Sequence, residues 1–194
     1  LSEKPKGGSA TAVINVNGED YSVAIGKDGK GTVEVPNPNT EDVYNDPTSL
    51  TATFQSVIGG GYSQVVAGTS TPAQITDTID PTTASITLAQ SDNDVLVTVS
   101  LDNPPAEDQP ATVHFTVNGE EHTVTIPAGE TSVDVPLNNL IGNNAYGDPT
   151  TVTAEVTSVE GGNFEATSNG LSVSQDFTPP VTQTTVTITG INTQ

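Results

Sequence analysis

The chain has 194 residues, 32% of them hydrophobic, and its 24 Asp and Glu against 4 Lys and Arg give a formal net charge of −20. A surface this acidic cannot neutralise phosphates and is repelled by anionic lipid, which excludes nucleic acid as a partner and membrane contact by this segment. Cys is absent, so disulfides are excluded and zinc is disfavoured, and the fold must be held by packing, by another metal ion, or by both.

The composition favours β-structure. Thr and Val recur throughout, Trp is absent, and Phe and Tyr number four each. β-branched residues suit strands better than helices, and so few aromatic side chains allow only a thin core, of the kind found between two β-sheets. No window shows an apolar period of 3.6 residues, so we expect an all-β fold with little or no helix.

One stretch of the chain occurs twice and reveals an internal repeat. Residues 44–62 and residues 146–165 each begin with Tyr, pass through an Asp-Pro-Thr turn into a strand of alternating apolar and polar residues, and end in a Gly-Gly turn. The equivalent tyrosines, Tyr44 and Tyr146, lie 102 positions apart. A repeat of about 100 residues predicts two small modules rather than one large domain.

The first copy matches the second only from the third strand of the module onward. Alternation predicts strands at residues 12–16 and 33–36, and Asn17-Gly18 is a hairpin signal. Leu1 falls opposite Leu101, so the first copy lacks the counterparts of the module's first two strands. Between the copies, residues 75–83 contain one Pro and no Gly, so the modules should follow one another almost directly rather than through a flexible linker.

The second copy is complete. Its alternating segments, separated by turn signals, are residues 83–88, 95–101, 113–117, 124–126, 133–135, 152–156 and 171–174. Seven short strands in about 100 residues predict an immunoglobulin-like β-sandwich. The predicted fold class is therefore all-β with tandem immunoglobulin-like β-sandwich modules, in which residues 1–81 form a module without its first two strands and residues 82–181 form a complete one.

Residues 182–194 resemble the start of a further copy. Residues 184–189, Thr-Thr-Val-Thr-Ile-Thr, correspond to residues 82–87, Thr-Thr-Ala-Ser-Ile-Thr. We therefore expect residues 182–194 to supply the first strand of a following module. Because an incomplete sandwich exposes unpaired strand edges, we also hypothesise strand exchange, in which this strand pairs with the open sheet of a neighbouring molecule.

Acidic side chains gather in predicted turns and near the ends of the modules. The candidate metal ligands are Asp77, Asp80, Asp46, Asp148, Asp176, Glu41, Asp42, Asp92 and Asp94. Asp77 and Asp80 rank first because they flank the junction without a basic neighbour, and Asp176 is interpreted as a repeat of Asp77 at the next junction. Oxygen ligands on turns are what Ca²⁺ prefers, so we expect Ca²⁺ as the cofactor, bridging consecutive modules. The alternative is that these residues are solvated turn positions, which Asp favours in any case.

Signals for catalysis are weak, and we expect no enzyme. The two histidines, His114 and His122, have Val13 and Tyr21 as counterparts in the first copy, which favours structural roles. The chain has no G-x-S-x-G nucleophile motif, and the glycines at 59–61 are not followed by the Lys and helix of a phosphate-binding loop.

Two motifs resemble a known family. Residues 32–53 read T-V-x-V-P-N-P-N-x-E-D-V-Y-x-D-P-x-S-L-T-A-T, and residues 73–80 read A-Q-I-T-D-T-I-D before the Thr-rich strand. Both are similar to the immunoglobulin-like extender repeats of the large type I-secreted, RTX-type bacterial biofilm adhesins. In the second copy, N-N-A-Y-G-D at residues 143–148 replaces E-D-V-Y-N-D at residues 41–46 of the first, so we expect any ion there to be bound more weakly.

The resemblance implies an extender function outside the cell, on the bacterial cell surface. Modules of this kind form long arrays, their partners are the neighbouring repeat modules of the same chain, and Ca²⁺ stiffens their junctions. An alternative is an adhesion module that recognises a carbohydrate or a protein. A third possibility, an accessory module of an exported hydrolase, predicts a catalytic domain next to it in the full gene.

Overall fold

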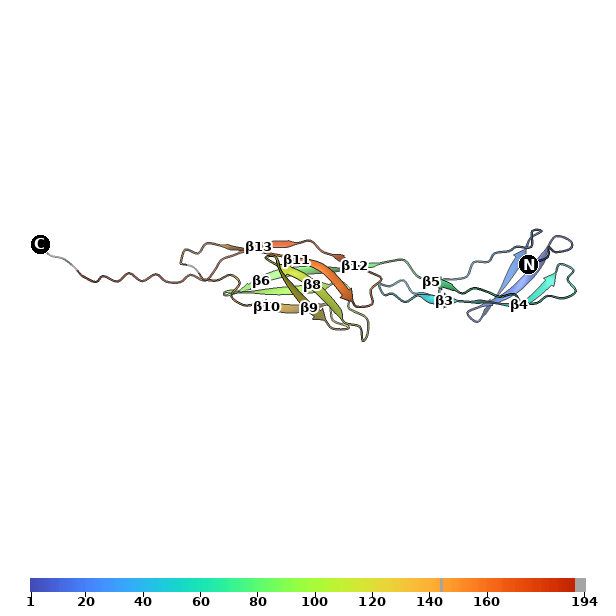
Figure 1. The fold of residues 1–194 in the computed structure, drawn as a ribbon, viewed down its shortest axis with the longest axis horizontal. Helices are drawn as coiled ribbons and strands as arrows, with labels where there is room; N and C mark the ends of the chain where they lie inside the picture. Colours follow the sequence, from blue (N-terminus) through green and yellow to red (C-terminus); the bar gives the residue numbers. More distant parts are fainter. Residues whose placement is uncertain (144, 191–194) are drawn as a thin grey trace. The chain divides into compact units, whose positions relative to one another are not determined.

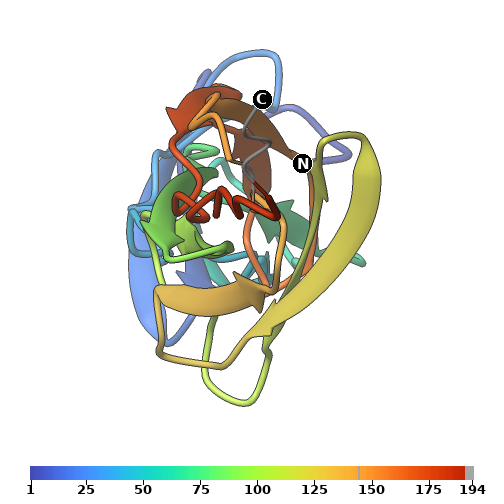
Figure 2. The same ribbon diagram turned by 90° about the vertical axis from the view of Figure 1, so that its left-hand side faces the viewer.

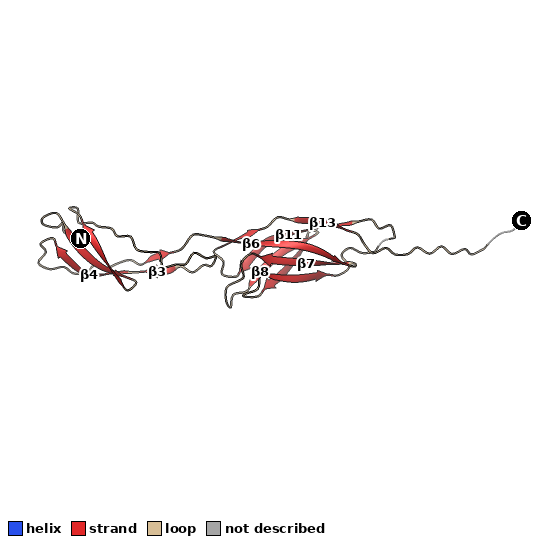
Figure 3. Ribbon diagram, turned by 180° about the vertical axis from the view of Figure 1, so that it is seen from behind, coloured by secondary structure: helices blue, strands red, loops and turns tan. Residues whose placement is uncertain are grey.

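The computed structural model describes residues 1–143 and 145–190. Within these residues the secondary structure consists of strands, turns and loops without any helix, which confirms the predicted all-β class (Figures 1 and 3). No membrane-spanning helix is therefore found in the described part of the chain. The residues form two compact units, Leu1–Thr78 and a second unit that begins at Ile79.

The second unit is a sandwich of two four-stranded sheets, with strand orders β10-β7-β6-β12 and β13-β11-β8-β9. The strands of the first sheet are β6 (Pro81–Ser91), β7 (Asp94–Leu101), β10 (Ser132–Leu137) and β12 (Ala166–Asn169). Those of the second are β8 (Ala111–Val117), β9 (Glu120–Ile126), β11 (Thr150–Gly161) and β13 (Val173–Phe177). Figure 2 shows the yellow β9 beside the gold β10, where the chain crosses from one sheet to the other. Two facing sheets joined by such crossings confirm the immunoglobulin-like sandwich.

The core of the second unit follows the predicted alternation. Every second residue of β7 is buried, and so is every second residue of β8. Val152 and Ala154 of β11, the neighbour of β8 in the same sheet, are also buried, as their parity predicts. Phe115, the largest fully buried side chain, is 1% exposed. Burial of side chains of this size contributes about 1.5–3 kcal/mol each, so the sandwich is held by this core.

The last strand of the module differs from its prediction at residues 171–174. The structure divides it between β12 and β13, with Gly170 just after β12. β12 runs parallel to β6 in one sheet, whereas β13 runs antiparallel to β11 in the other. The amide of Gly170 donates to the carbonyl of Ala84 at 2.6 Å, after which the chain changes sheets. Alternation alone gives no sign of such a change, since both halves remain extended.

The hairpin between β8 and β9 depends on its Asn-Gly turn. Asn118 and Gly119 both have positive φ, +51° and +84°, and Asn17 and Gly18 repeat this geometry in the first unit with +52° and +89°. Two central residues with positive φ define the type I′ turn, whose twist matches that of the flanking strands.

Replacing Gly119 by Ala should lower the free energy of unfolding of the second unit by about 1–2 kcal/mol, because a Cβ is disfavoured at positive φ. No atom lies within 4 Å of the added methyl group, so the cost is conformational. Chemical denaturation measures the loss. The control Gly190→Ala adds a methyl group to equally open space without a positive φ, and should leave the stability unchanged. Equal effects of the two substitutions would contradict this account.

The first unit contains the counterpart of only one sheet of the sandwich. Its strands are β1 (Ala10–Val16), β2 (Glu19–Ile25), β3 (Thr48–Leu50), β4 (Ala52–Gly59) and β5 (Ala73–Ile75). They form a sheet with the order β2-β1-β4 and a separate β3-β5 ribbon. Each unit has a β-bulge at the equivalent position. The β1–β4 register shifts before Ile14, and the β8–β11 register shifts at Phe115, the counterpart of Ile14.

The predicted strands at residues 33–36 and 184–189 are not strands in the structure. Their counterparts in the second unit show the reason. β10 pairs with β7, and β6 pairs with β7 and β12. In the first unit, the described residues contain no counterpart of β7, so residues 33–36 lack their partner strand. Residues 182–190 likewise have no partner strand within the described part of the chain, and Val186 and Ile188 are 85% and 81% exposed.

The core of the first unit is correspondingly small. Its buried cluster comprises Ala10, Ala12, Val23 and Ile25. Ile14 packs against this cluster but stays only half-buried, whereas its counterpart Phe115 is covered by the facing sheet. The difference follows from the number of sheets, because a single sheet can bury its apolar face only against another layer.

Candidate metal centre

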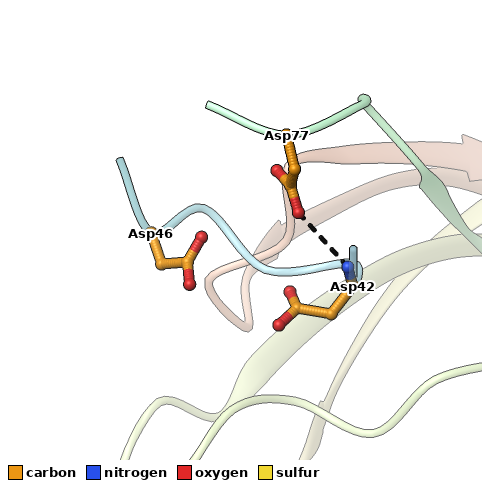
Figure 4. A group of neighbouring side chains, drawn as sticks. All are labelled: Asp42, Asp46 and Asp77. Carbon is orange, nitrogen blue, oxygen red and sulfur yellow. Dashed lines mark hydrogen bonds between the residues drawn. The ribbon is translucent and has the colours of Figure 1, made fainter. Parts of the chain in front are cut away.

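Three carboxylates converge in the first unit. Asp42, Asp46 and Asp77 each place one oxygen within 4.8 Å of the other two, and Figure 4 shows the side chains turned toward a common space. Ca²⁺ binds oxygen at roughly 2.3–2.6 Å, so two oxygens on one ion lie up to about 5 Å apart. The spacing of these carboxylates therefore fits ligands of a single Ca²⁺ ion.

The β3-β5 ribbon brings Asp77 to the other two residues. Thr48 pairs with Ile75, which places the chain after β5 beside the loop before β3. The side-chain amide of Asn39 donates to the carbonyl of Ile75 at 2.7 Å, and that of Asn37 donates to the carbonyl of Thr76 at 3.2 Å. These bonds hold the segment that carries Asp77 against the loop that carries Asp42 and Asp46.

Hydrogen bonds within the loop set the direction of the Asp42 side chain. Its Oδ1 accepts a bond from the amide of Tyr44 at 2.7 Å, an arrangement that Asp adopts readily in turns. The amide of Asp42 donates to Oδ2 of Asp77 at 3.2 Å, the contact drawn in Figure 4. Asp42 and Asp77 are partly buried, whereas Asp46 is exposed.

The electrostatics of this group favour a cation. Three like charges held close together repel one another, and partial burial weakens the screening of that repulsion by water and salt. The chain has no Lys or Arg after residue 30. The neighbouring Glu41 adds to the negative potential, and its Oε1 accepts a bond of 3.4 Å from the hydroxyl of Thr78. The site can attract a divalent cation and hold it through hard oxygen ligands.

The other predicted ligands lie outside this group. Asp80 belongs to the second unit, where its amide donates to Oε2 of Glu165 at 2.8 Å. Asp92 lies in the β6–β7 turn with φ +53°, and Asp94 accepts a bond of 2.7 Å from the amide of Asn139. Asp148 is exposed. Among the described residues, Asp42, Asp46 and Asp77 form the one cluster of acids with metal-ligand spacing.

The strand register corrects the interpretation of Asp176. Thr48 pairs with Ile75 in the first unit, and the equivalent Thr150 pairs with Phe177 in the second. Asp176 is thus equivalent to Gln74 and does not repeat Asp77. Its Oδ1 accepts a bond of 2.6 Å from the hydroxyl of Thr151 on the neighbouring strand.

The same register shows that the group of three is not repeated. The counterpart of Asp77 is Pro179, and that of Asp46 is Asp148. The counterpart of Asp42 is Asn144, which lies outside the described residues. The second copy therefore retains one carboxylate of the three.

The histidines have packing contacts. The ring of His122 stacks on Phe115, with centroids 5.3 Å apart. Nδ1 of His114 lies 3.1 Å from the hydroxyl of Thr123, and its Nε2 lies 3.9 Å from Oε1 of the exposed Glu160. These contacts involve neighbouring strands of one sheet and agree with the structural roles predicted for both rings.

Comparison with known proteins gives one family match. The model of the LapA domain matches residues 80–189. No curated protein matches the chain. Among solved structures, the crystal structure of the selenomethionine-substituted alpha chain of the chicken interferon gamma receptor is similar, with 12% sequence identity and a TM-score of 0.33. That alignment covers 93% of this chain and 88% of the receptor chain.

Proposed function

Because the chain belongs to the LapA domain family, a family of biofilm adhesins, we propose that it is an extender segment of a bacterial cell-surface adhesin. Its task is mechanical: it sets the distance between the cell and a distal binding region. It acts outside the cell.

The observation that carries this proposal is the repetition of one structural unit along the chain. β1, β2 and β4 recur as β8, β9 and β11, with the same Asn-Gly hairpin and the same bulge. The family match begins at residue 80, next to the start of the second unit at Ile79. A repeated module of this kind suits a spacer, because length grows by adding copies without a new fold.

We further propose that Ca²⁺ binds to Asp42, Asp46 and Asp77 and stiffens the chain where it leaves the first unit. The first unit ends at Thr78, and Asp77 is the residue immediately before that end. An ion shared by Asp77 and the 42–46 loop would fix these last residues to the body of the unit. Ca²⁺ supplies the positive charge that joins these carboxylates, and the chain supplies the ligands.

A replacement experiment in the full adhesin tests the extender function. Deleting these modules should reduce adhesion of the cells, and inserting an unrelated immunoglobulin-like domain pair of equal length should restore it, because only length matters for a spacer. Surface labelling of intact parent cells with an antibody against the modules measures their exposure, and the deletion strain is the negative control. Failure of the equal-length replacement would favour instead a module that itself recognises a carbohydrate or protein.

A further inference from the structure

The chain enters and leaves the second unit at opposite ends of one strand. β6 begins at Pro81, which pairs with Ala166 of β12. Near the other end of β6, the side-chain amide of Gln90 donates to the carbonyl of Thr178, the residue after β13, at 2.6 Å. Tension on the chain on either side of this unit therefore acts along the length of β6.

β6 and β12 are parallel neighbours that such tension pulls in opposite directions. Their pairing runs from Pro81–Ala166 to Ala84–Asn169. β6 is pulled from its first residue, whereas β12 precedes the exit of the chain and is pulled from its last. Opposite pulls slide parallel strands past each other, so the evenly spaced hydrogen bonds of the ladder are all strained together. Strands pulled apart from the same end would instead lose one bond at a time.

Side chains fasten the two strands where tension enters. Oε2 of Glu165, the residue before β12, accepts a bond of 2.8 Å from the amide of Asp80, the residue before β6. The hydroxyls of Thr83 and Ser168 lie directly opposite each other in the register and are 2.8 Å apart. These bonds join β6 to β12 in addition to the backbone ladder.

The far end of β12 is held by a close backbone contact. The amide of Gly170 donates to the carbonyl of Ala84 at 2.6 Å, and a Cβ on Gly170 would lie 2.7 Å from that same oxygen. Gly170 is not among the glycines with positive φ, so its backbone conformation does not require glycine. Glycine is needed here because any side chain would push the end of β12 away from β6.

β6 is also held firmly on its other side. It lies between β7 and β12 in its sheet, and its pairing with β7 runs from Ala84–Leu101 to Ser91–Asp94. Alternate side chains along most of β6 are buried. Withdrawal of β6 would therefore break two ladders and expose part of the core. β13, by contrast, is an edge strand that pairs with β11.

We propose that the parallel pair of β6 and β12 is a shear lock, by which the second unit resists unfolding under tension. The proposal deepens the spacer function, which supplies the tension, because a spacer between a cell and a bound surface is pulled whenever the cell is. A module that unfolded under this pull would lose its fixed length. The lock itself rests on the strand topology of the second unit alone.

Single-molecule force spectroscopy of the whole chain, held at its two ends, tests the lock. Forced unfolding follows the unfolding rate rather than the equilibrium stability. Unfolding of the second unit is identified by the contour length that residues 81–177 release. Thr83→Val keeps the shape of the side chain and removes its hydroxyl contact with Ser168. We expect the unfolding rate of this unit at constant force to rise about fivefold, the effect of losing one typical hydrogen bond.

Two matched variants remove a similar bond elsewhere in the unit. Thr98→Val removes the bond of 2.6 Å from its hydroxyl to Oδ1 of Asp134, between β7 and β10, and should leave the unfolding rate at constant force unchanged. Thr153→Val removes the hydroxyl contact of 3.2 Å with Ser174, between β11 and β13, and should raise that rate less than Thr83→Val does. Circular dichroism confirms the fold of all three variants, and chemical denaturation measures their equilibrium stability.

An unchanged unfolding rate at constant force in Thr83→Val would overturn the proposal. So would an equal rise in Thr98→Val, which would show that the rate reports general stability. A larger rise in Thr153→Val would place the resistance between β11 and β13 instead. Replacement by unrelated domains of equal length tests the spacer function separately, so either proposal can fail while the other holds.

Discussion

Ca²⁺ in about hundredfold excess over its dissociation constant is expected to raise the melting temperature of the first unit by roughly 10–20 °C. Binding to the folded state alone at that excess stabilises it by about 2.7 kcal/mol. One kcal/mol shifts the melting temperature of a small domain by roughly 4–8 °C. Extracellular calcium modules bind with dissociation constants of about 0.1–1 mM, so a hundredfold excess corresponds to about 10–100 mM Ca²⁺. Differential scanning calorimetry with Ca²⁺ and with a chelator measures the shift.

The variant Asp77→Asn should abolish most of this shift. An Asn side chain still offers an oxygen for the hydrogen bond from the amide of Asp42, so the loop keeps its anchor while one negative ligand is lost. Without Ca²⁺ the same variant should melt slightly higher than the parent chain, because one repulsive charge is removed. The two opposite signs distinguish loss of a ligand from loss of structure.

Asp148→Asn is the matched control for the proposed calcium site. It removes the carboxylate at the position equivalent to Asp46 in the second copy. In that copy, the position equivalent to Asp77 is occupied by Pro179. The Ca²⁺-dependent shift of the first unit should be unchanged in this variant. An unchanged shift in Asp77→Asn, or an equal loss in Asp148→Asn, would show that the ion binds elsewhere.

Phe115→Ala should destabilise the second unit by about 3–5 kcal/mol, the usual cost of removing a fully buried aromatic side chain. Phe115 is 1% exposed between the two sheets, so its loss leaves a cavity that neither sheet can fill by moving alone. Urea denaturation followed by intrinsic fluorescence is poorly suited to a chain without Trp, so calorimetry or circular dichroism is the appropriate measurement.

Ile14→Ala at the equivalent position of the first unit should cost much less, about 1 kcal/mol. Ile14 is only half-buried, and the free energy lost scales with the apolar area that the side chain had removed from water. A comparable cost at both positions would mean that the sheet of the first unit is covered by a layer absent from the described residues. The pair of variants therefore measures what the facing sheet contributes to a module.

Much of the fold could be predicted from local patterns in the chain. Alternation placed Val152 and Ala154 in the core, and the Asn118-Gly119 pair marked the hairpin, because side-chain parity and positive φ are properties of neighbouring residues. The choice of acidic residues also included Asp42, Asp46 and Asp77, the three members of the acidic cluster. Sequence spacing nevertheless favours Asp80 over Asp42 as a metal ligand. It also suggests that Asp176 is a repeat of Asp77.

The sequence by itself therefore determined the period of the repeat, the buried faces of the strands and the acidic chemistry of the candidate ligands. Only the tertiary structure decided which of these elements meet. The pairing of Thr48 with Ile75 joins Asp77 to Asp42 and Asp46, and the pairing of Thr150 with Phe177 shows that Asp176 occupies a different position. Residues 33–36 and 184–189 have strand patterns but form no strand. The physical reason is that a β-strand and a metal site both depend on partners distant in sequence, whereas alternation and spacing report only what is near.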